Sequence, residues 1–176
     1  MGSGCLETVK ALINNGDEIN FEVKTTSSFT PLIIASIQGF YEIAELLIEN
    51  GALLLYKKRK KKGPLIYAAK NGQIHIVSLL IRKGVHPEYS DSSGNSPLHY
   101  AAAFGWLNIV KYLIKWGANP NQMNDWGAKP LDLAIMKNNF GIYDYLLGLK
   151  SVDKEIIDNF GRTVRYFEIN LIFKFL

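Results

Sequence analysis

Histidine and cysteine side chains are the residues of this chain best suited to metal binding or nucleophilic chemistry. His75, His86 and His99 fall in different structural positions, so they do not form the ligand set of a metal site. Cys5 is the only cysteine, and no motif places a base beside it. The glycine-rich loops that cradle nucleotide phosphates are also missing. We therefore expect no enzymatic activity and no cofactor.

Basic side chains form the most unusual chemical feature of the sequence. One run places six cations in succession: Lys57, Lys58, Arg59, Lys60, Lys61 and Lys62. The chain has 20 basic residues and a formal net charge of +4, so the 14 basic residues outside the run are outnumbered by 16 acidic ones. Adjacent like charges repel one another, so folding gains nothing from this run.

The composition is that of a folded protein in a reducing compartment. With 176 residues and a hydrophobic content of 48%, the chain is long enough for one domain or a short array of smaller units. A single cysteine excludes an internal disulfide, and the N-terminus has no secretory signal. No apolar run is long enough to span a membrane. We expect a cytoplasmic location, a nuclear location, or both.

The elements that carry these residues repeat along the chain. Four segments, "TPLIIASIQGF", "GPLIYAAKNGQ", "SPLHYAAAFGW" and "KPLDLAIMKNN", share a proline, then a leucine, and an alanine four residues after the proline. The prolines are separated by 33 residues: Pro31, Pro64, Pro97 and Pro130. A fixed period of this length predicts a stacked array of similar units.

Proline predicts where the first helix of each unit begins, because its fixed φ and missing N–H suit the first helical position. Thr30 and Ser96 precede the proline in two units and are good caps. Gly63 caps more weakly and Lys129 poorly.

Glycine and asparagine predict where the helices end. Eight residues after the proline stands a glycine, replaced once by Asn138, which tolerates the left-handed backbone between two helices. A second helix with apolar residues at helical spacing follows and ends at a further glycine, namely Gly51, Gly84 or Gly117. Each unit is therefore predicted to be a helix, a tight turn, a second helix and a loop.

The third unit, "SPLHYAAAFGWLNIVKYLIKWGANPN", resembles the ankyrin repeat, whose signature is Thr-Pro-Leu-His, an alanine pair, Gly, an Ile/Val-Val-x-Leu-Leu helix and Gly-Ala-Asn. The resemblance extends from Thr25 to about Leu149 as four copies. It implies an all-α fold, an α-solenoid of helix-turn-helix repeats with β-hairpin finger loops. It also implies that His99 fixes its turn by hydrogen bonding.

The four copies define the expected organisation of the chain. We expect a partial N-terminal repeat with only a second helix and loop at residues 1–24, full repeats at 25–57, 58–90, 91–123 and 124–150, and a degenerate or truncated fifth repeat or tail at 151–176. Terminal repeats deviate because they must shield the stack from water. The tail ends in apolar residues, so truncation from a longer protein and a natural end are both open.

The resemblance implies a binding groove made by the finger loops and the inner helix surface. Transferred copy by copy, it gives these expected partner-binding residues: Phe29, Arg59, Lys60, Lys62, Lys70, Asn95, Phe104, Asp125, Trp126 and Met136. Aromatic and arginine side chains are the expected anchors, because they bury much area at little entropy cost. For Phe29 and Trp126, packing against neighbouring fingers is an equally open interpretation.

The basic run Lys57–Lys62 falls in the second finger, where the resembled family usually carries Asp-x-x-Gly. Three interpretations are open. The run is a nuclear import signal, a contact for an acidic protein, phosphoinositide headgroups or nucleic acid, or a solvated loop without a special role.

The resemblance therefore implies a non-enzymatic scaffold or adaptor module that binds a protein partner in its concave groove. Two alternatives stay open. In the first, the chain is an electrostatic adaptor that docks on an anionic membrane or nucleic acid through the Lys57–Lys62 finger. In the second, it is the regulatory fragment of a larger enzyme or channel.

Overall fold

A computed structural model describes residues 3–16, 18–21, 29–55 and 62–152 of the chain. Within these ranges the chain forms nine α-helices and no β-strand. The helices fall into two compact units, Met1–Val85 (unit 1) and His86–Leu176 (unit 2). Within the same ranges, no helix is both long enough and apolar enough to span a membrane.

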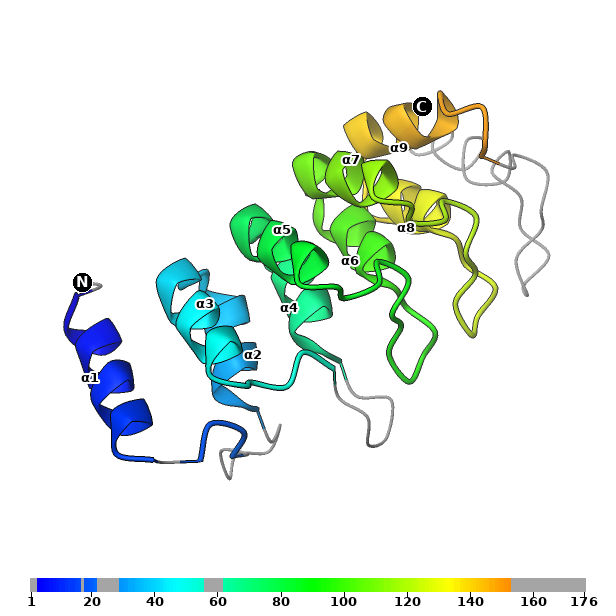
Figure 1. The fold of residues 1–176 in the computed structure, drawn as a ribbon. Helices are drawn as coiled ribbons and strands as arrows, with labels where there is room; N and C mark the ends of the chain where they lie inside the picture. Colours follow the sequence, from blue (N-terminus) through cyan, green and yellow to red (C-terminus); the bar gives the residue numbers. More distant parts are fainter. Residues whose placement is uncertain (1–2, 17, 22–28, 56–61, 153–176) are drawn as a thin grey trace. The chain divides into compact units, whose positions relative to one another are not determined.

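Unit 1 contains two helical hairpins and one additional helix. Its helices are α1 (Ser3–Asn14), α2 (Pro31–Gln38), α3 (Tyr41–Glu49), α4 (Pro64–Lys70) and α5 (Ile74–Arg82). α2 pairs with α3 and α4 pairs with α5, and the two hairpins stack because α2 contacts α4 and α3 contacts α5. α1 packs against α3 (Figure 1).

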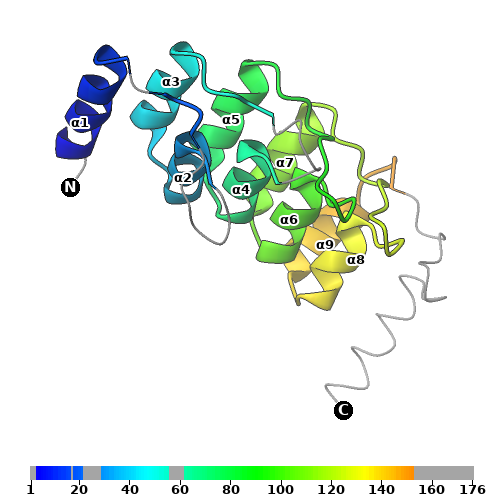
Figure 2. The same cartoon turned by 90° about the horizontal axis from the view of Figure 1, so that it is seen from below.

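Unit 2 repeats the same arrangement. Its helices are α6 (Pro97–Phe104), α7 (Leu107–Lys115), α8 (Pro130–Met136) and α9 (Phe140–Leu147). α6 pairs with α7, α8 pairs with α9, and the first helices α6 and α8 lie side by side (Figure 2). The all-α repeat architecture expected from the sequence is confirmed.

The predicted helix starts are confirmed, because α2, α4, α6 and α8 each begin at the repeating proline. The hydroxyls of Thr30 and Ser96 each accept a hydrogen bond from the backbone N–H three residues later, at 3.4 Å. Gly63 offers no side-chain cap. At Lys129 the direction of the capping bond is reversed: the backbone N–H of Lys129 donates to the side chain three residues later, Oδ2 of Asp132, at 2.8 Å.

The predicted helix ends are confirmed as well. The residues between the two helices of each hairpin have positive φ: Gly39 (80°), Gly72 (78°), Gly105 (85°) and Asn138 (59°). The glycines that follow the second helices share this geometry: Gly51 (91°), Gly84 (92°) and Gly117 (89°).

The leucine and alanine of the repeating pattern form the core of both units. All eight are at most 2% exposed: Leu32, Leu65, Leu98, Leu131, Ala35, Ala68, Ala101 and Ala134. Each buried leucine contributes about 2 kcal/mol through loss of apolar contact with water. Because each repeat places its leucine and its alanine at the same positions, the stacked hairpins within each unit pack in the same register.

The two described loops of unit 2, before α6 and before α8, are closed turns rather than paired strands. In unit 2 the N–H of Asp91 donates to the carbonyl of Asn95 at 3.1 Å, and that of Asn124 donates to the carbonyl of Ala128 at 3.0 Å. The β-hairpin detail of the prediction is therefore not confirmed. Most of the basic second finger (57–61) and the expected fifth repeat lie outside the described residues.

Candidate binding surface

Asp91 shapes the loop before α6. Its Oδ1 accepts hydrogen bonds from the N–H groups of Ser93 and Asn95, both at 3.0 Å, and its Oδ2 accepts one from the Tyr100 hydroxyl at 2.7 Å. The carboxylate is buried, which strengthens these bonds relative to water. Asp91 thereby ties the loop to the first helix that follows it.

Asn124 shapes the loop before α8, at the position one repeat after Asp91. Its Oδ1 accepts from the N–H groups of Trp126 and Ala128, at 3.1 and 2.9 Å. Its Nδ2 donates to Oδ1 of Asn95 at 2.9 Å, and this bond joins the two loops. A backbone bond from the N–H of Asp125 to the carbonyl of Ser93, at 3.0 Å, reinforces the contact. Trp126 is therefore held on a firmly bonded turn.

His99 completes the connection between the loops. Its Nδ1 accepts a hydrogen bond from the N–H of Ser96 at 3.2 Å, so Nε2 carries the proton and donates to the carbonyl of Ala128 at 3.0 Å. The turn-fixing role implied by the resemblance is confirmed. Burial lowers the pKa of His99 to about 4, although the bond to Ala128 and the charge of Asp91 oppose this shift.

Seven large apolar side chains are exposed to solvent in the described part of unit 2, and we call the three that lie on or just before α6 and α8 at the expected binding positions the exposed apolar set. Trp126 is 52% exposed, Phe104 51% and Met136 45%. Phe104 and Met136 end α6 and α8, which pack side by side, and Trp126 belongs to the turn before α8. Tyr100 supports Phe104, with ring centroids 6.5 Å apart.

The two other expected partner-binding residues of unit 2 differ in their exposure to solvent. Asp125 is exposed beside Trp126. Asn95 is only 7% exposed, because its side chain lies between the two loops and accepts the bond from Asn124. Its environment is that of a loop-joining residue rather than a surface contact.

In unit 1, the expected binding residues Phe29, Lys62 and Lys70 are half-buried. The ring of Phe29 meets that of Tyr67 edge to face, with centroids 5.2 Å apart and planes inclined by 74°. This contact favours the packing interpretation of Phe29. Lys70 lies in the last turn of α4, where a cation complements the helix dipole, and Lys62 lies just before α4. The remaining cations of the basic run lie outside the described residues: Lys57, Lys58, Arg59, Lys60 and Lys61.

Two side-chain amides that the sequence did not single out join neighbouring hairpins. Nε2 of Gln73 donates to the carbonyl of Ile37 at 3.1 Å, and Nδ2 of Asn139 donates to that of Ala102 at 2.8 Å. Both amides satisfy carbonyls at the end of the preceding first helix. The equivalent positions hold Phe40 and Trp106, so no constant residue type marks this role.

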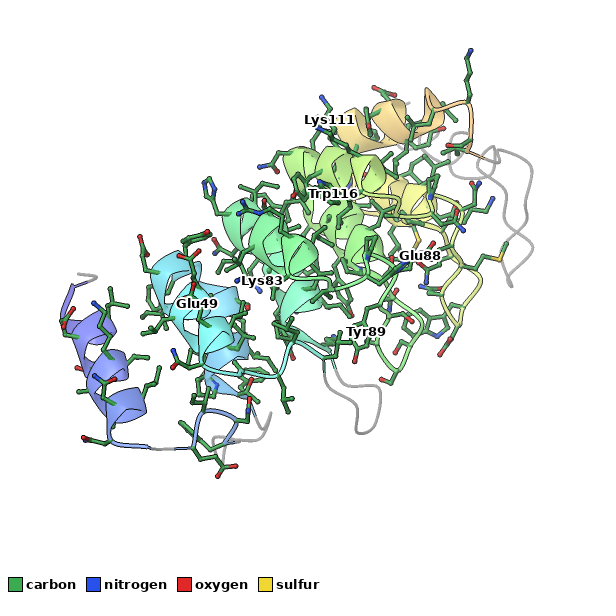
Figure 3. All side chains as sticks on the ribbon, in the orientation of Figure 1. Glu49, Lys83, Glu88, Tyr89, Lys111 and Trp116 are labelled. Atoms are coloured by element: carbon green, nitrogen blue, oxygen red, sulfur yellow. The ribbon has the colours of Figure 1, made fainter. Side chains whose placement is uncertain are left out.

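Within the described ranges, no three histidine, cysteine or acidic side chains come together in a way that could hold a metal ion. His75 is exposed on α5, and Nδ1 of the exposed His86 lies 3.9 Å from Oε2 of Glu88. Glu88 is labelled in Figure 3. The surface described above offers apolar and hydrogen-bonding contacts. It is suited to binding another macromolecule.

The repeated hairpins with their bonded loops define a repeat protein of the ankyrin class. The family model described as ankyrin repeats (3 copies) matches residues 1–58 and 65–158, and the chain belongs to this family. Ankyrin repeats are generally protein–protein interaction modules and typically non-enzymatic. A comparison with curated proteins found no matching relative.

Proposed function

We propose that this chain is a scaffold or adaptor that binds a protein partner through the exposed apolar set of unit 2. The observation that carries this proposal is the exposure of Trp126, Phe104 and Met136, each close to one half. Large apolar side chains of this kind are typical anchors of protein interfaces. Asp125 and Lys137, both exposed, supply a polar rim.

The hydrogen bonds behind Trp126 support the same proposal. Its backbone is fixed by Asn124, and the loop that carries it is bonded to the preceding loop at Asn95 and Ser93. A side chain on such a preformed turn loses little conformational freedom when a partner covers it. In unit 1, Phe29 has a packing role against Tyr67.

The test is affinity capture from cells with the full chain and its Trp126→Ala variant. Removing a central aromatic anchor costs about 2 kcal/mol or more of binding free energy. The partner should therefore bind Trp126→Ala at least about tenfold more weakly than the wild type. Trp116→Ala is the matched control, because Trp116 is 46% exposed but lies at the end of α7, outside the exposed apolar set (Figure 3). Equal loss with both variants, or with neither, contradicts the proposal.

A second candidate function is favoured by the six consecutive cations Lys57–Lys62. In this alternative the chain is an adaptor whose second finger docks on an anionic membrane or nucleic acid. A variant with glutamine at all six positions separates the two functions in the same capture experiment. Loss of the partner with this variant but not with Trp126→Ala supports the electrostatic adaptor.

A further inference from the structure

Three asparagines of this chain are followed directly by glycine. The pairs are Asn15–Gly16, Asn50–Gly51 and Asn71–Gly72. Asparagine is one of the thermolabile residues of proteins. Because glycine lacks a Cβ, its backbone nitrogen can approach the side-chain amide of the preceding asparagine closely. All three pairs belong to unit 1, and each directly follows the last residue of a helix, namely α1, α3 or α4.

The side chain of Asn71 is held in place at the end of α4. Its Nδ2 donates to the carbonyl of Tyr67 at 2.8 Å, and the side chain is half-buried. The backbone beyond Gly72 is fixed as well, because the N–H of Gln73 donates to the carbonyl of Ala68 at 2.9 Å. Rotation of the Asn71 amide toward Gly72 would break the bond to Tyr67.

The side chain of Asn50 is exposed but is also held. Its Nδ2 donates to the carbonyl of Leu46 at 2.8 Å. Two further bonds fix the backbone around Gly51. The N–H of Ala52 donates to the carbonyl of Leu47 at 2.9 Å, and Nδ2 of Asn20 donates to the carbonyl of Gly51 at 3.2 Å.

The side chain of Asn15 differs from both. It is exposed, and among the described residues it has no hydrogen-bond partner. The N–H of Gly16 donates to the carbonyl of Ile13 at 3.0 Å, much as that of Gly51 donates to Ile48 at 3.1 Å. The two glycines are therefore held alike, and the free amide of Asn15 makes the difference. A Cβ on Gly16 would have nothing within 4 Å, so a ring closed at this position has room.

We propose that Asn15 is a site of spontaneous deamidation, and that the bonded amides of Asn50 and Asn71 protect them from the same reaction. The backbone nitrogen of Gly16 loses its proton to a base and forms a bond to Cγ of Asn15. The bond from Cγ to Nδ2 breaks, and Nδ2 takes up a proton and leaves as ammonia. The product is a five-membered succinimide.

Water then opens this ring at one of its two carbonyl carbons. Breaking the new bond between Cγ and the Gly16 nitrogen gives aspartate. Breaking the original peptide bond gives isoaspartate, which routes the main chain through the former side chain. The whole reaction consumes one water and releases one ammonia, and no atom is oxidised or reduced.

Both products place a carboxylate at the C-terminal end of α1. A negative charge is unfavourable there because of the helix dipole, and α1 has no basic residue in its last turn to offset it. Asp17 and Glu18 follow in the sequence, so the new charge also meets like charges. Because α1 packs against α3, deamidation loosens the helix at this end of unit 1.

The test is peptide mapping by mass spectrometry of the full chain, sampled over time in mildly alkaline buffer. Base favours the deprotonated backbone nitrogen. We expect Asn15 to react at least about fivefold faster than Asn50 or Asn71, the factor that corresponds to one hydrogen bond. The three pairs serve as controls for one another in every sample. In urea that unfolds the chain, the three rates should become similar, because the dipeptide alone then sets the reactivity.

Asn15→Gln measures the consequence for α1, because glutamine cannot close the five-membered ring. Amide hydrogen exchange in α1 should become about two- to fivefold faster after incubation of the wild type, and should not change after incubation of this variant. Unchanged exchange in fully converted wild type overturns the effect on α1.

Other outcomes overturn the site itself. These are equal rates at the three pairs in the folded chain, a faster reaction at Asn50 or Asn71, or no product at Asn15. None of these readouts involves Trp126, so this proposal and the proposed function fail independently.

Discussion

The buried imidazole of His99 links the stability of unit 2 to pH. Its pKa is about 4 in the folded chain and 6.5 in its reference state, because burial disfavours the charged form. Between these values the unfolded chain binds the proton and the folded chain does not. The stabilisation is therefore complete above pH 6.5 and is lost as the pH falls toward 4.

We predict that this proton lowers the free energy of unfolding by about 3 kcal/mol across that range. Urea denaturation of unit 2 signals at a series of pH values measures the effect. His99→Asn should remove this part of the pH dependence and lower the stability at neutral pH. His75→Gln, at an exposed histidine, serves as control and should keep the wild-type pH profile. An unchanged profile in His99→Asn contradicts the prediction.

Gly94 is required where the two bonded loops of unit 2 meet. Its φ is +73°, and a Cβ at this position would lie 2.7 Å from Oδ1 and 2.9 Å from the backbone nitrogen of Asp125. We predict that Gly94→Ala destabilises the chain by about 2 kcal/mol, from backbone strain and displacement of the neighbouring loop. Urea denaturation measures the change.

Gly51→Ala isolates the backbone part of that cost. Its φ is +91°, but nothing lies within 4 Å of the added Cβ. The expected destabilisation is about 1 kcal/mol. If both variants lose the same stability, the contact with Asp125 is unimportant and the steric argument is wrong.

At the scale of elements, an amide side chain contributes to the contact between each stacked pair of hairpins. Nδ2 of Asn139, which precedes α9, donates to the carbonyls of Ala102 and Ala103 at 2.8 and 3.0 Å. We predict that Asn139→Ala destabilises unit 2 by about 1 to 2 kcal/mol, because two carbonyls at the end of α6 lose a half-buried donor. Faster amide hydrogen exchange at the end of α6 should accompany the loss.

Asn139→Gln is the informative control for this prediction. Gln73, which has a longer side chain, makes the equivalent hydrogen bond in unit 1, where its amide donates to the carbonyl of Ile37. Glutamine at position 139 should therefore restore most of the stability lost in Asn139→Ala. A glutamine variant as unstable as the alanine variant would show that the packing of Asn139, and not its amide, is responsible.

The helices of this chain were predictable from the sequence because their signals are local. Proline fixes φ at the first position, and Gly39 or Asn138 supplies the left-handed backbone at the turn. The buried leucine and alanine series followed from the same period. These residues act within one turn of the helix they start or end, so no tertiary information was needed.

The contacts between repeats were harder to predict from the sequence, because they join residues that lie about one repeat apart and whose types vary. Asn95 has the position of a surface residue, yet Asn124 reaches it from the next loop and buries it. Phe29 packs on Tyr67 for a similar reason.

At the scale of the whole chain, two candidate surfaces are chemically separable. The exposed apolar set lies in unit 2, and the six cations form a charged segment of their own. Apolar contacts depend little on salt, whereas charge contacts with a polyanion weaken as counterions compete. Salt concentration therefore distinguishes the basic run from the exposed apolar set.

We predict that the chain binds single-stranded DNA, used as a model polyanion, with a steep salt dependence set by Lys57–Lys62. If all six cations contact phosphates, the slope of log K against log salt is roughly −4. Glutamine at the six positions should abolish binding, because the remaining chain is left with 14 basic and 16 acidic residues. Fluorescence anisotropy over a range of salt concentrations measures both effects.

The matched control for that experiment removes cations elsewhere. Lys111 and Lys115 are exposed on α7, so Lys111→Gln with Lys115→Gln lowers the net charge without touching the run (Figure 3 labels Lys111). Binding in this variant should keep nearly the wild-type slope, because counterion release counts only the cations in contact with phosphate. A slope near zero in the wild type, or one lowered equally by both variants, means that overall charge rather than the second finger attracts polyanions.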